Sequence, residues 1–341
     1  MRIAQVSPLF ESVPPNGYGG TERVISYLTE ELMRQGQEVT LFAAGDSRSA
    51  ARLVSCVRSS IRNSVLDQSW LAYHLIQIDM VARMADEFDV IHFHTDALHF
   101  PLARTLAAPH VSTLHGRLDF PHLAPLYRHF SDVPVVSISD SQRRPLPHAN
   151  WRATVHHGLP TDLYAFQPDA GDYFLFVGRL SPEKRVDRAV EIARRCGRPL
   201  YVAAKLNKEE ESYFNERLKP LFRHPLVTYL GEVGETEKRE LLQHAAALLF
   251  PIDWPEPFGL VMIEAFSCGT PVIAYRNGAV PEIVEDGVTG FVVCSQDEAV
   301  RAAQRIDTID RHACRAAFES RFTAARMAAN YLQVYRQLLS H

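Results

Sequence analysis

The chain has 341 residues, of which 46% are hydrophobic and 22% are charged, with a formal net charge of -4. This length suits two domains of about 150 residues, and the charge excludes a general attraction to nucleic acid. No apolar run predicts a membrane span, and residues 1–10 lack the pattern of a signal peptide. Five scattered cysteines without a CxxC pair favour a reducing cytoplasm. Peripheral attachment to the inner membrane face stays open.

The first half of the chain alternates strand patterns with a helical pattern. Residues 2–7, RIAQVS, predict a buried strand, and residues 21–36 predict a helix that Thr21 caps and Gly36 ends. Further strands are expected at 38–44, 88–94, 110–115 and 134–139. Such an alternation indicates a parallel sheet covered on both faces.

The pattern restarts after a proline-rich segment at 158–171, which we expect to link two domains. A strand at 172–178 and a helix at 186–197 open the second half. Strands are then expected at 199–204, 227–233, 247–252, 271–275 and 290–293. The last stretch, 320–341, predicts a long amphipathic helix. Two α/β domains in tandem favour a cleft at the carboxyl ends of their strands, where such sheets bind ligands.

A glycine-rich loop follows the first strand and contains Gly17, Gly19 and Gly20. Glycines before a helix let backbone N–H groups approach an anion, which the helix dipole favours. The dinucleotide fingerprint G-x-G-x-x-G is absent. Asp46, after the second strand, nevertheless keeps an NAD site open as an alternative. In a purely structural interpretation, the glycines only cap the helix.

Two cations lie beyond the strand at 172–178. Arg179 and Lys184 are five residues apart in GRLSPEK and precede the helix at 186–197. Arginine offers a planar fork and lysine a point charge, so together they can bind a diphosphate. The alternative is a pair of solvated surface charges. We favour the functional interpretation because the pair follows a glycine at a strand end and Lys184 is the first lysine of the chain.

Two glutamates flank the start of an apolar segment in DWPEPFGLVMIEAFSCG. Glu256 precedes the predicted helix, and Glu264 lies about a turn and a half inside it. Backbone amides of the first turn have no acceptor within a helix and can bind an anion. These amides belong to Phe258, Gly259, Leu260 and Val261. One acid is expected to hold a sugar ring and the other a ribose. Alternatively, Glu256 caps the helix and Glu264 is a salt-bridged core residue.

Three patterns together closely resemble the retaining glycosyltransferases of family 4. They are E-P-F-G-L-x-x-x-E-A, G-R-L-S-x-E-K and the N-terminal G-G-x-E-R. Further matches are TLHG (113–116), SISDSQR (137–143), HHGLPTDLYAF (156–166), YLGEV (229–233) and NGAVPEIVEDGVTGFVV (277–293). The resemblance covers nearly the whole chain. It implies the α/β GT-B fold, in which two Rossmann-like domains face a central cleft.

The resemblance also implies domain boundaries. Residues 1–160 would form the acceptor-binding domain, and residues 161–319 the domain that binds a nucleotide sugar. The helix at 320–341 would cross back onto the first domain. The acceptor site would lie mostly in loops of the first domain, at 8–20, 46–70 and 116–131, which carry no diagnostic chemistry.

Roles for individual residues follow from the resemblance. Gly19 and Gly20 would approach the donor, and Arg179 and Lys184 would neutralise the leaving diphosphate. His115 would lie near the transferred sugar.

Glu256 would hold hydroxyls of the transferred sugar and Glu264 the ribose. The amides of Phe258, Gly259, Leu260 and Val261 would contact sugar and phosphate, and the backbone from Gly231 to Val233 the nucleobase. The catalytic group predicted in this way is Arg179, Lys184, Glu256 and His115.

Two positions depart from the family pattern. Arg185 stands where the family usually has glycine after the lysine, which puts the shape of that turn in doubt. His157 stands where the family commonly has asparagine. Neither change touches the predicted diphosphate ligands.

A metal site is a weaker possibility. His92, His94 and His99 are close in sequence, but alternate histidines on a strand more often are hydrogen-bonded core groups. No Asp-x-Asp occurs, which disfavours the metal-dependent transferase design. We therefore expect no metal and no cofactor beyond the nucleotide sugar, which is a co-substrate.

The function expected from the resemblance is transfer of a hexose from a nucleotide sugar to a hydroxyl acceptor, with retention of configuration. UDP-linked donors are favoured over GDP-linked ones on family frequency. The acceptor would be a small molecule, a glycan or a lipid-linked compound, and the sequence predicts no oligomeric state. Alternatives are an epimerase or hydrolase-like enzyme without an acceptor, an NAD-binding reductase and a non-catalytic sugar-nucleotide sensor.

Overall fold

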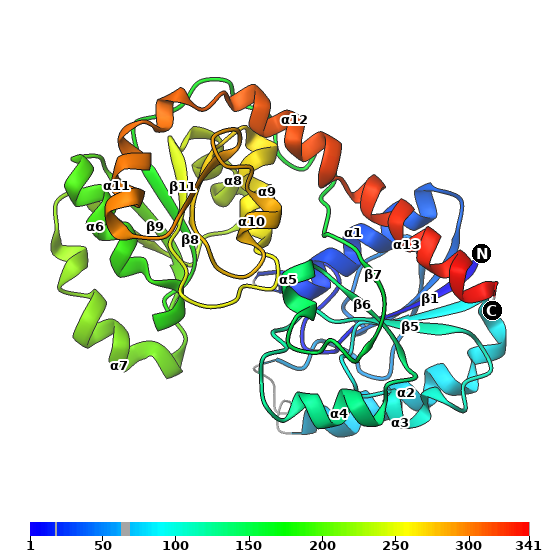
Figure 1. Cartoon of the computed structure of the whole chain (residues 1–341). Helices are drawn as coiled ribbons and strands as arrows, with labels where there is room; N and C mark the ends of the chain where they lie inside the picture. Colours follow the sequence, from blue (N-terminus) through cyan, green and yellow to red (C-terminus); the bar gives the residue numbers. More distant parts are fainter. Residues whose placement is uncertain (18, 63–68, 341) are drawn as a thin grey trace. The chain divides into compact units, whose positions relative to one another are not determined.

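The computed structural model describes residues 1–17, 19–62 and 69–340. Parts of two predicted acceptor loops, residues 18 and 63–68, and the last residue of the predicted final helix lie outside the described residues. The chain forms two compact units. Unit 1 comprises Met1–Pro160 and Ala324–His341, and unit 2 comprises Thr161–Thr323. Both ends of the chain therefore belong to unit 1 (Figure 1).

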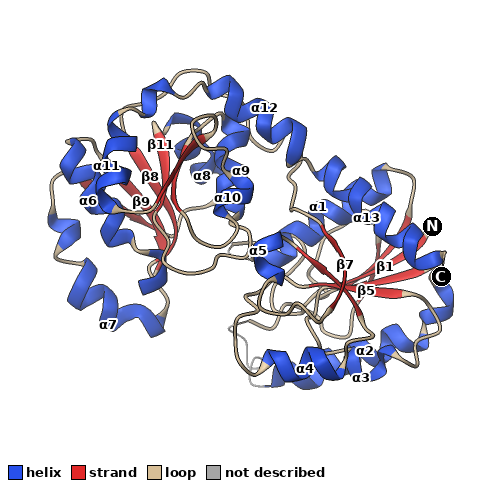
Figure 2. Cartoon of the chain, in the orientation of Figure 1, coloured by secondary structure: helices blue, strands red, loops and turns tan. Residues whose placement is uncertain are grey.

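Unit 1 contains a seven-stranded parallel sheet in the order β3-β2-β1-β4-β5-β6-β7 (Figure 2). The strands are β1 (Arg2–Val6), β2 (Glu38–Phe42), β3 (Arg52–Val54), β4 (Val90–Phe93), β5 (His110–Thr113), β6 (Pro134–Ser137) and β7 (Asn150–Thr154). The strand order reverses between β1 and β4. Such a switch point is where open α/β sheets bind ligands.

Helices cover both faces of this sheet (Figure 2). They are α1 (Gly20–Arg34), α2 (Trp70–Arg83), α3 (Phe100–Ala103), α4 (Leu123–His129), α5 (Asp140–Arg143), α13 (Ala324–Leu339) and the short η2 (Ala85–Glu87). The C-terminal helix α13 packs beside α1. The last segment of the chain therefore completes unit 1, and its buried side chains include Tyr331 and Tyr335.

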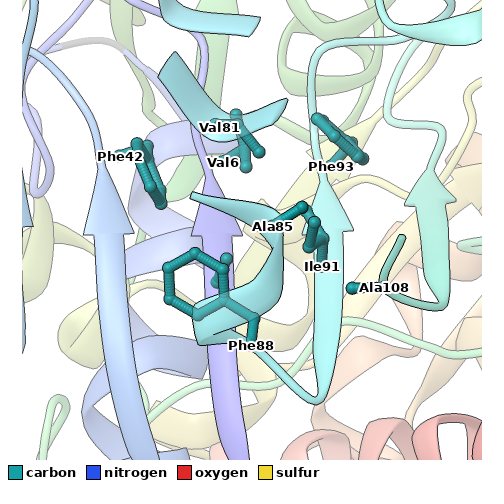
Figure 3. Close-up of a cluster of buried hydrophobic side chains, with 9 residues drawn as sticks. Val6, Phe42, Val81, Ala85, Phe88, Ile91, Phe93 and Ala108 are labelled. Carbon is teal, nitrogen blue, oxygen red and sulfur yellow. The ribbon is translucent and has the colours of Figure 1, made fainter. Parts of the chain in front are cut away.

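The core of unit 1 explains why the strand patterns form one sheet. Val6 on β1, Phe42 on β2 and Phe93 on β4 are buried in a cluster that Val81 and Ala85 cover from α2 and η2 (Figure 3). Burial of each large apolar side chain in this way stabilises the folded protein by about 1.5–3 kcal/mol relative to leaving it exposed. The hydrophobic residues of neighbouring strands thus share one buried face.

Unit 2 repeats the design with a six-stranded parallel sheet in the order β10-β9-β8-β11-β12-β13. The strands are β8 (Phe174–Arg179), β9 (Leu200–Lys205), β10 (Val227–Gly231), β11 (Ala247–Phe250), β12 (Val272–Tyr275) and β13 (Gly290–Val293). The α-helices are α6 (Val186–Cys196), α7 (Glu211–Tyr213), α8 (Glu235–His244), α9 (Leu260–Cys268), α10 (Val280–Ile283), α11 (Gln296–Gln304) and α12 (Arg311–Arg321). Short turns are η3 (Pro182–Lys184), η4 (Lys208–Glu210), η5 (Phe214–Leu218), η6 (Leu221–Arg223) and η7 (Ile306–Thr308). The switch point lies between β8 and β11.

Several predicted boundaries are corrected by the structure. The prediction that Thr21 caps α1 is wrong, because Gly19 is the cap residue and the helix begins at Gly20. The helix expected from Phe258 begins two residues later. The single helix expected at 320–341 is two helices, since α12 ends at Arg321 and α13 begins at Ala324. None of the described helices is long and apolar enough to cross a membrane.

Candidate active site

The predicted charged residues of unit 2 meet at the carboxyl ends of β8 and β11. Arg179 is the last residue of β8, and Lys184 ends the η3 turn that follows. Glu256 lies in the turn between β11 and α9. The two loops are joined by a backbone hydrogen bond, in which the N–H of Asp253 donates to the carbonyl of Glu183 at 2.8 Å. Residues far apart in sequence are therefore adjacent at the switch point.

Lys184 and Glu256 form an ion pair, with 2.5 Å between Nζ and Oε2. Their side chains are only 15% and 13% exposed, so the pair is largely shielded from water. Lys184 Nζ also lies 4.8 Å from the centre of the Trp254 ring. The ion pair with Glu256 and the contact with the aromatic face of Trp254 both restrict the conformations of the lysine side chain. Lys184 is thus held in place before any ligand binds.

Arg179 is paired more loosely than Lys184. Its guanidinium lies 3.5 Å from Glu183 and 3.9 Å from Glu210, distances at which hydrogen bonding is weak. Its Nε has no hydrogen-bond partner within the part of the chain that the structure describes. Close pairing of an arginine with a carboxylate or phosphate uses two parallel N–H bonds. This guanidinium therefore keeps hydrogen-bonding capacity for an anion.

The start of α9 supplies backbone donors at the same sheet edge. Gly259 is its cap residue and has a φ of 87°, a left-handed conformation that favours glycine. The amides of Leu260 and Val261 open the first helical turn, while Phe258 precedes the helix and its side chain is buried. We name Arg179, Lys184, Glu256 and the first turn of α9 the diphosphate site, after the role that the sequence predicts for them.

Glu264 is engaged in a second ion-paired cluster. Its side chain is 6% exposed, and its Oε1 lies 2.9 Å from Lys238 Nζ on α8. The same ammonium lies 3.2 Å from Glu235, which accepts a hydrogen bond from the Tyr164 hydroxyl at 2.6 Å. This geometry agrees with the salt-bridged alternative for Glu264. Its role toward a ribose stays a prediction.

The residues expected near a nucleobase lie at the end of β10. This strand ends at Gly231, which has a φ of 76°, so Val233 follows in the loop before α8. The expected strand was two residues too long. Gly231 and Val233 lie at the carboxyl edge of the same sheet as the diphosphate site.

Arg185 resolves the doubt about the turn after Lys184. Its backbone is left-handed, with φ 53° and ψ 47°, so it adopts a conformation usually occupied by glycine. Its guanidinium is paired with Asp187 at 2.8 Å and Asp253 at 2.9 Å. The turn therefore keeps its shape, and these ion pairs offset the cost of a side chain in this conformation.

Gly278 braces the Glu256 turn, a role that sequence reasoning missed. The Ala279 N–H donates to the Glu256 carbonyl at 2.9 Å, and the Asn277 side chain donates to the carbonyl of Ile252 at 2.8 Å. A Cβ on Gly278 would lie 2.3 Å from both N and O of Glu256. The segment NGAVPE, quoted for the family resemblance, could have indicated this close approach through its glycine.

The predicted residues of unit 1 also lie at carboxyl ends of strands. Gly19 is the cap residue of α1 and Gly20 its first residue, and a Cβ on Gly19 would lie 2.8 Å from Pro15 Cβ. Asp46, proposed for an NAD ribose, instead accepts hydrogen bonds from the backbone and hydroxyl of Ser60 at 2.9 and 3.0 Å. The carboxylate is used to hold a loop.

His115 follows β5 and belongs to a group of hydrogen-bonded histidines. Its Nε2 lies 2.8 Å from His94 Nδ1, and its ring stacks on His157 with 5.3 Å between ring centres. Burial lowers the pKa of His115 to about 3, so the ring is neutral at neutral pH. His157, the second departure from the family pattern, therefore packs against the predicted sugar-binding histidine.

The histidines considered as metal ligands have other partners. Both ring nitrogens of His92 lie 2.7 Å from hydroxyls, those of Tyr335 and Thr113, and His94 lies between Gln5 and His115. His99 Nε2 contacts the Ser112 hydroxyl at 3.0 Å. Within the described ranges, no group of three or more His, Cys, Asp or Glu side chains is arranged to hold a metal ion.

Comparison with known families covers both units. Residues 18–170 match the family described as Glycosyltransferase Family 4, and residues 166–313 match the family described as Glycosyl transferases group 1.

Curated relatives include named transferases. The O-antigen chain mannosyltransferase C of Escherichia coli is 23% identical over 99% of both proteins. The phosphatidyl-myo-inositol mannosyltransferase of Mycobacterium leprae is 24% identical over 89% of this chain and 86% of that protein. The D-inositol 3-phosphate glycosyltransferase of Frankia alni is 31% identical, with the match spanning 50% of this chain and 46% of that protein. An uncharacterised Klebsiella pneumoniae protein is matched over 45% of its length.

Solved structures share the fold of this chain. A glycosyltransferase involved in avilamycin A biosynthesis is similar with a TM-score of 0.76 and 26% identity, over 99% of this chain and 98% of that chain. An Anabaena protein solved in complex with UDP and glucose has a TM-score of 0.74 at 19% identity, over 99% and 100% of the two chains.

Proposed function

This chain belongs to the family 4 glycosyltransferases with the GT-B fold, and on that premise we propose that it moves a hexose from a nucleotide diphosphate sugar to a hydroxyl acceptor. The transfer retains the configuration of the sugar and uses no metal ion. The chain is thus a transferase, and the donor, the stereochemistry and the metal independence are the parts proposed here.

The observation that carries the proposal is the ion pair of Lys184 with Glu256 beside the first turn of α9. A diphosphate at this sheet edge would meet the ammonium of Lys184, the guanidinium of Arg179 and backbone N–H groups. The sugar attached to it would meet the carboxylate of Glu256, which accepts hydrogen bonds from hydroxyls. One site therefore offers positive charge to the leaving group and an acceptor to the transferred ring.

The proposed reaction follows from the charges at this site. The bond from the anomeric carbon to the diphosphate oxygen breaks, and its electron pair stays on that oxygen. Lys184, Arg179 and the helix dipole stabilise this developing charge. The acceptor oxygen forms its bond on the same face of the sugar, and its proton passes to the leaving phosphate oxygen. The products are a glycoside of retained configuration and a nucleoside diphosphate.

UDP is the first nucleotide to test, because the similar Anabaena protein was solved with UDP and glucose. The mannosyltransferases among the relatives make mannose the second sugar to test. The loops predicted to bind the acceptor belong to unit 1.

A thermal-shift screen of UDP-, GDP- and ADP-sugars, followed by an assay of the best binder, tests the proposal. We expect one nucleotide to raise the melting temperature and its sugar to be hydrolysed slowly without an acceptor, with retention at the anomeric carbon. Rapid turnover of the donor into an epimer without a second substrate would support the epimerase alternative. No binding by any of the three would contradict the proposal.

A further inference from the structure

A continuous chain of polar side chains connects the C-terminal helix to His115 in unit 1. Its members come from four elements or their ends, β1, β4, β5 and α13, and are consecutive hydrogen-bond neighbours. In order they are Tyr331, Thr113, His92, Tyr335, Gln5, His94 and His115. The distances between consecutive neighbours run from 2.7 to 3.1 Å. A chain in which each group contacts the next can pass on the direction of its hydrogen bonds.

Burial makes the direction of these bonds strict. Gln5, His92, Thr113 and Tyr335 are 0% exposed, and His94 is 2% exposed. A buried donor that meets no acceptor destabilises the folded protein by its full desolvation penalty, about 1–3 kcal/mol. Burial also lowers the pKa of His92 and of His94 well below the usual value, so each ring is neutral and carries one proton. One N–H in the chain therefore determines the next.

The amide of Gln5 sets the direction. Its Nε2 donates to the Tyr335 hydroxyl at 3.1 Å, and its Oε1 lies 2.8 Å from His94 Nε2. Since a carbonyl oxygen only accepts, His94 carries its proton on Nε2. His94 Nδ1 is then an acceptor, and the His115 Nε2 that lies 2.8 Å from it is the donor.

The other end of the chain agrees with this direction. The Tyr335 hydroxyl, which accepts from Gln5, donates to His92 Nδ1 at 2.7 Å. His92 then carries its proton on Nε2 and donates to the Thr113 hydroxyl at 2.7 Å. Thr113 contacts the Tyr331 hydroxyl at 2.9 Å. Every contact between consecutive members of the chain has one donor and one acceptor in this arrangement, and a rotated Gln5 amide would reverse the direction throughout.

We propose that Gln5, His94 and Tyr335 are positioning residues that fix the tautomer of His115, so that its Nδ1 presents a lone pair, and not an N–H, to a hydroxyl of the transferred sugar. Nδ1 of His115 has no hydrogen-bond partner within residues 1–17, 19–62 and 69–340. The assignment of the sugar as ligand rests on the proposed function, whereas the tautomer does not. The C-terminal helix thereby determines the polarity of a site residue more than 200 positions away in sequence.

The test reads the tautomer directly by ¹⁵N NMR of the imidazoles in histidine-labelled full-length protein, with His115 assigned from a His115→Gln variant. At pH 7 we expect His115 to carry its proton on Nε2, with Nδ1 unprotonated. Gln5→Glu places a carboxylate against His94 and favours its doubly protonated form. His94 Nδ1 then donates to His115 Nε2, and the proton of His115 moves to Nδ1.

Two further variants keep the test decisive. Gln304→Glu makes the same chemical change at an exposed position of α11 and should leave the His115 signals as in wild type. If Gln5→Glu does not fold, Tyr335→Phe removes the hydroxyl that orients the Gln5 amide, and we expect His115 signals of both tautomers. A protonated Nδ1 in wild type, or an unchanged tautomer in both the Gln5 and Tyr335 variants, would overturn the proposal.

Activity with UDP-glucose separates this proposal from the proposed function. If the protein turns the donor over, Gln5→Glu should lower kcat about tenfold or more, and Gln304→Glu should not. If wild type is inactive on every donor while the NMR result is as expected, the function fails and the tautomer assignment stands.

Discussion

Unit 1 and unit 2 share the same order of six parallel strands, to which unit 1 adds a seventh strand at one edge. In each unit we expect a ligand at the switch point between the two central strands. The side chains at the carboxyl ends of these strands differ in chemistry between the two units. In unit 1, neutral imidazoles, an amide and hydroxyls form a buried hydrogen-bond chain that ends at His115. In unit 2, ammonium and guanidinium groups lie against carboxylates, as in the pair of Lys184 with Glu256.

This difference teaches that the sheet topology determines where a ligand can bind. The side chains at that edge determine how the site responds to a change of pH or to the loss of a charged partner. The stability of a buried hydrogen-bond chain of neutral groups depends on pH, because protonation of a histidine would place a charge where water cannot solvate it. An ion pair at a sheet edge is sensitive to the loss of either partner, because the remaining charge is then unpaired. The following predictions test whether the two edges differ in this way.

The largest effect is expected from removing a charge of the diphosphate site. Lys184→Ala, Arg179→Ala and Glu256→Ala should each lower turnover roughly a hundredfold or more, as loss of a transition-state charge partner does. Steady-state rates with the best donor measure this. Lys219→Ala removes an exposed lysine of the same unit and should leave the rate unchanged. Rates like wild type in a folded triple variant would refute the assignment.

A backbone substitution should come next in size. Gly278→Ala forces a Cβ to within 2.3 Å of the Glu256 backbone, so the Glu256 turn must shift. We expect turnover to fall roughly tenfold or more, since small misplacements of binding groups are costly, and stability to fall by more than about 1 kcal/mol. Gly287→Ala is the matched control, because Gly287 also has a positive φ of 77° but its Cβ would meet nothing within 4 Å. Equal losses of turnover in both variants would disprove that the close approach of Gly278 positions the Glu256 turn.

The histidine chain should make unit 1 sensitive to acid. The pKa of His115 is about 3 in the folded protein, below its usual value of 6.5. Between these values the unfolded state binds more protons, so stability is full above about pH 6.5 and is lost as pH falls toward 3. In this pH window, each such histidine lowers the free energy of unfolding by up to about 1.4 kcal/mol for each pH unit of acidification.

Urea unfolding at pH 7.5 and pH 5.5 measures this loss. His115→Gln should reduce the difference between the two conditions, whereas His122→Gln, at an exposed position of unit 1, should not. A wild-type midpoint that does not change with pH would contradict neutral burial of these rings.

The smallest effect is expected at the turn after Lys184. Arg185→Gly relieves a left-handed side-chain conformation, worth about 1–2 kcal/mol, but removes ion pairs with Asp187 and Asp253 that are each worth up to about 1 kcal/mol. The two changes offset each other, so the free energy of unfolding should change by less than about 1 kcal/mol. A much larger loss would mean that Asp253 depends on Arg185 for its position.

Much of the architecture could be predicted from the sequence, because strands with continuous apolar runs and helices with one apolar face have clear periodicities. The strands around residues 2–7, 38–44 and 172–178 are examples. The exceptions have weak patterns. β3 has three residues and lies at a sheet edge, and β7, NWRAT, is only partly buried. Helix α2 was missed because it exposes Leu75 and Ile76 to solvent, which obscures its buried face.

The residues of the candidate site were proposed from the sequence, but the contacts between them could not be. Sequence spacing and family resemblance selected Lys184 and Glu256 separately, yet their ion pair spans 72 positions and depends on how the loops after β8 and β11 pack. The partner of Glu264, Lys238, lies on another helix. Likewise, His92 and His94 suggested a metal from their spacing alone. Their actual partners include Tyr335, which is 243 positions from His92.

Calorimetric titration of UDP and GDP into the full-length protein tests the central claim most directly, with Lys184→Gln, Arg179→Gln and the double variant alongside. We predict that one nucleotide binds wild type, that each single variant weakens its binding at least about tenfold, as loss of a charge-assisted contact does, and that the double variant abolishes measurable heat. Binding of equal strength in wild type and the double variant would contradict a diphosphate held by these two cations.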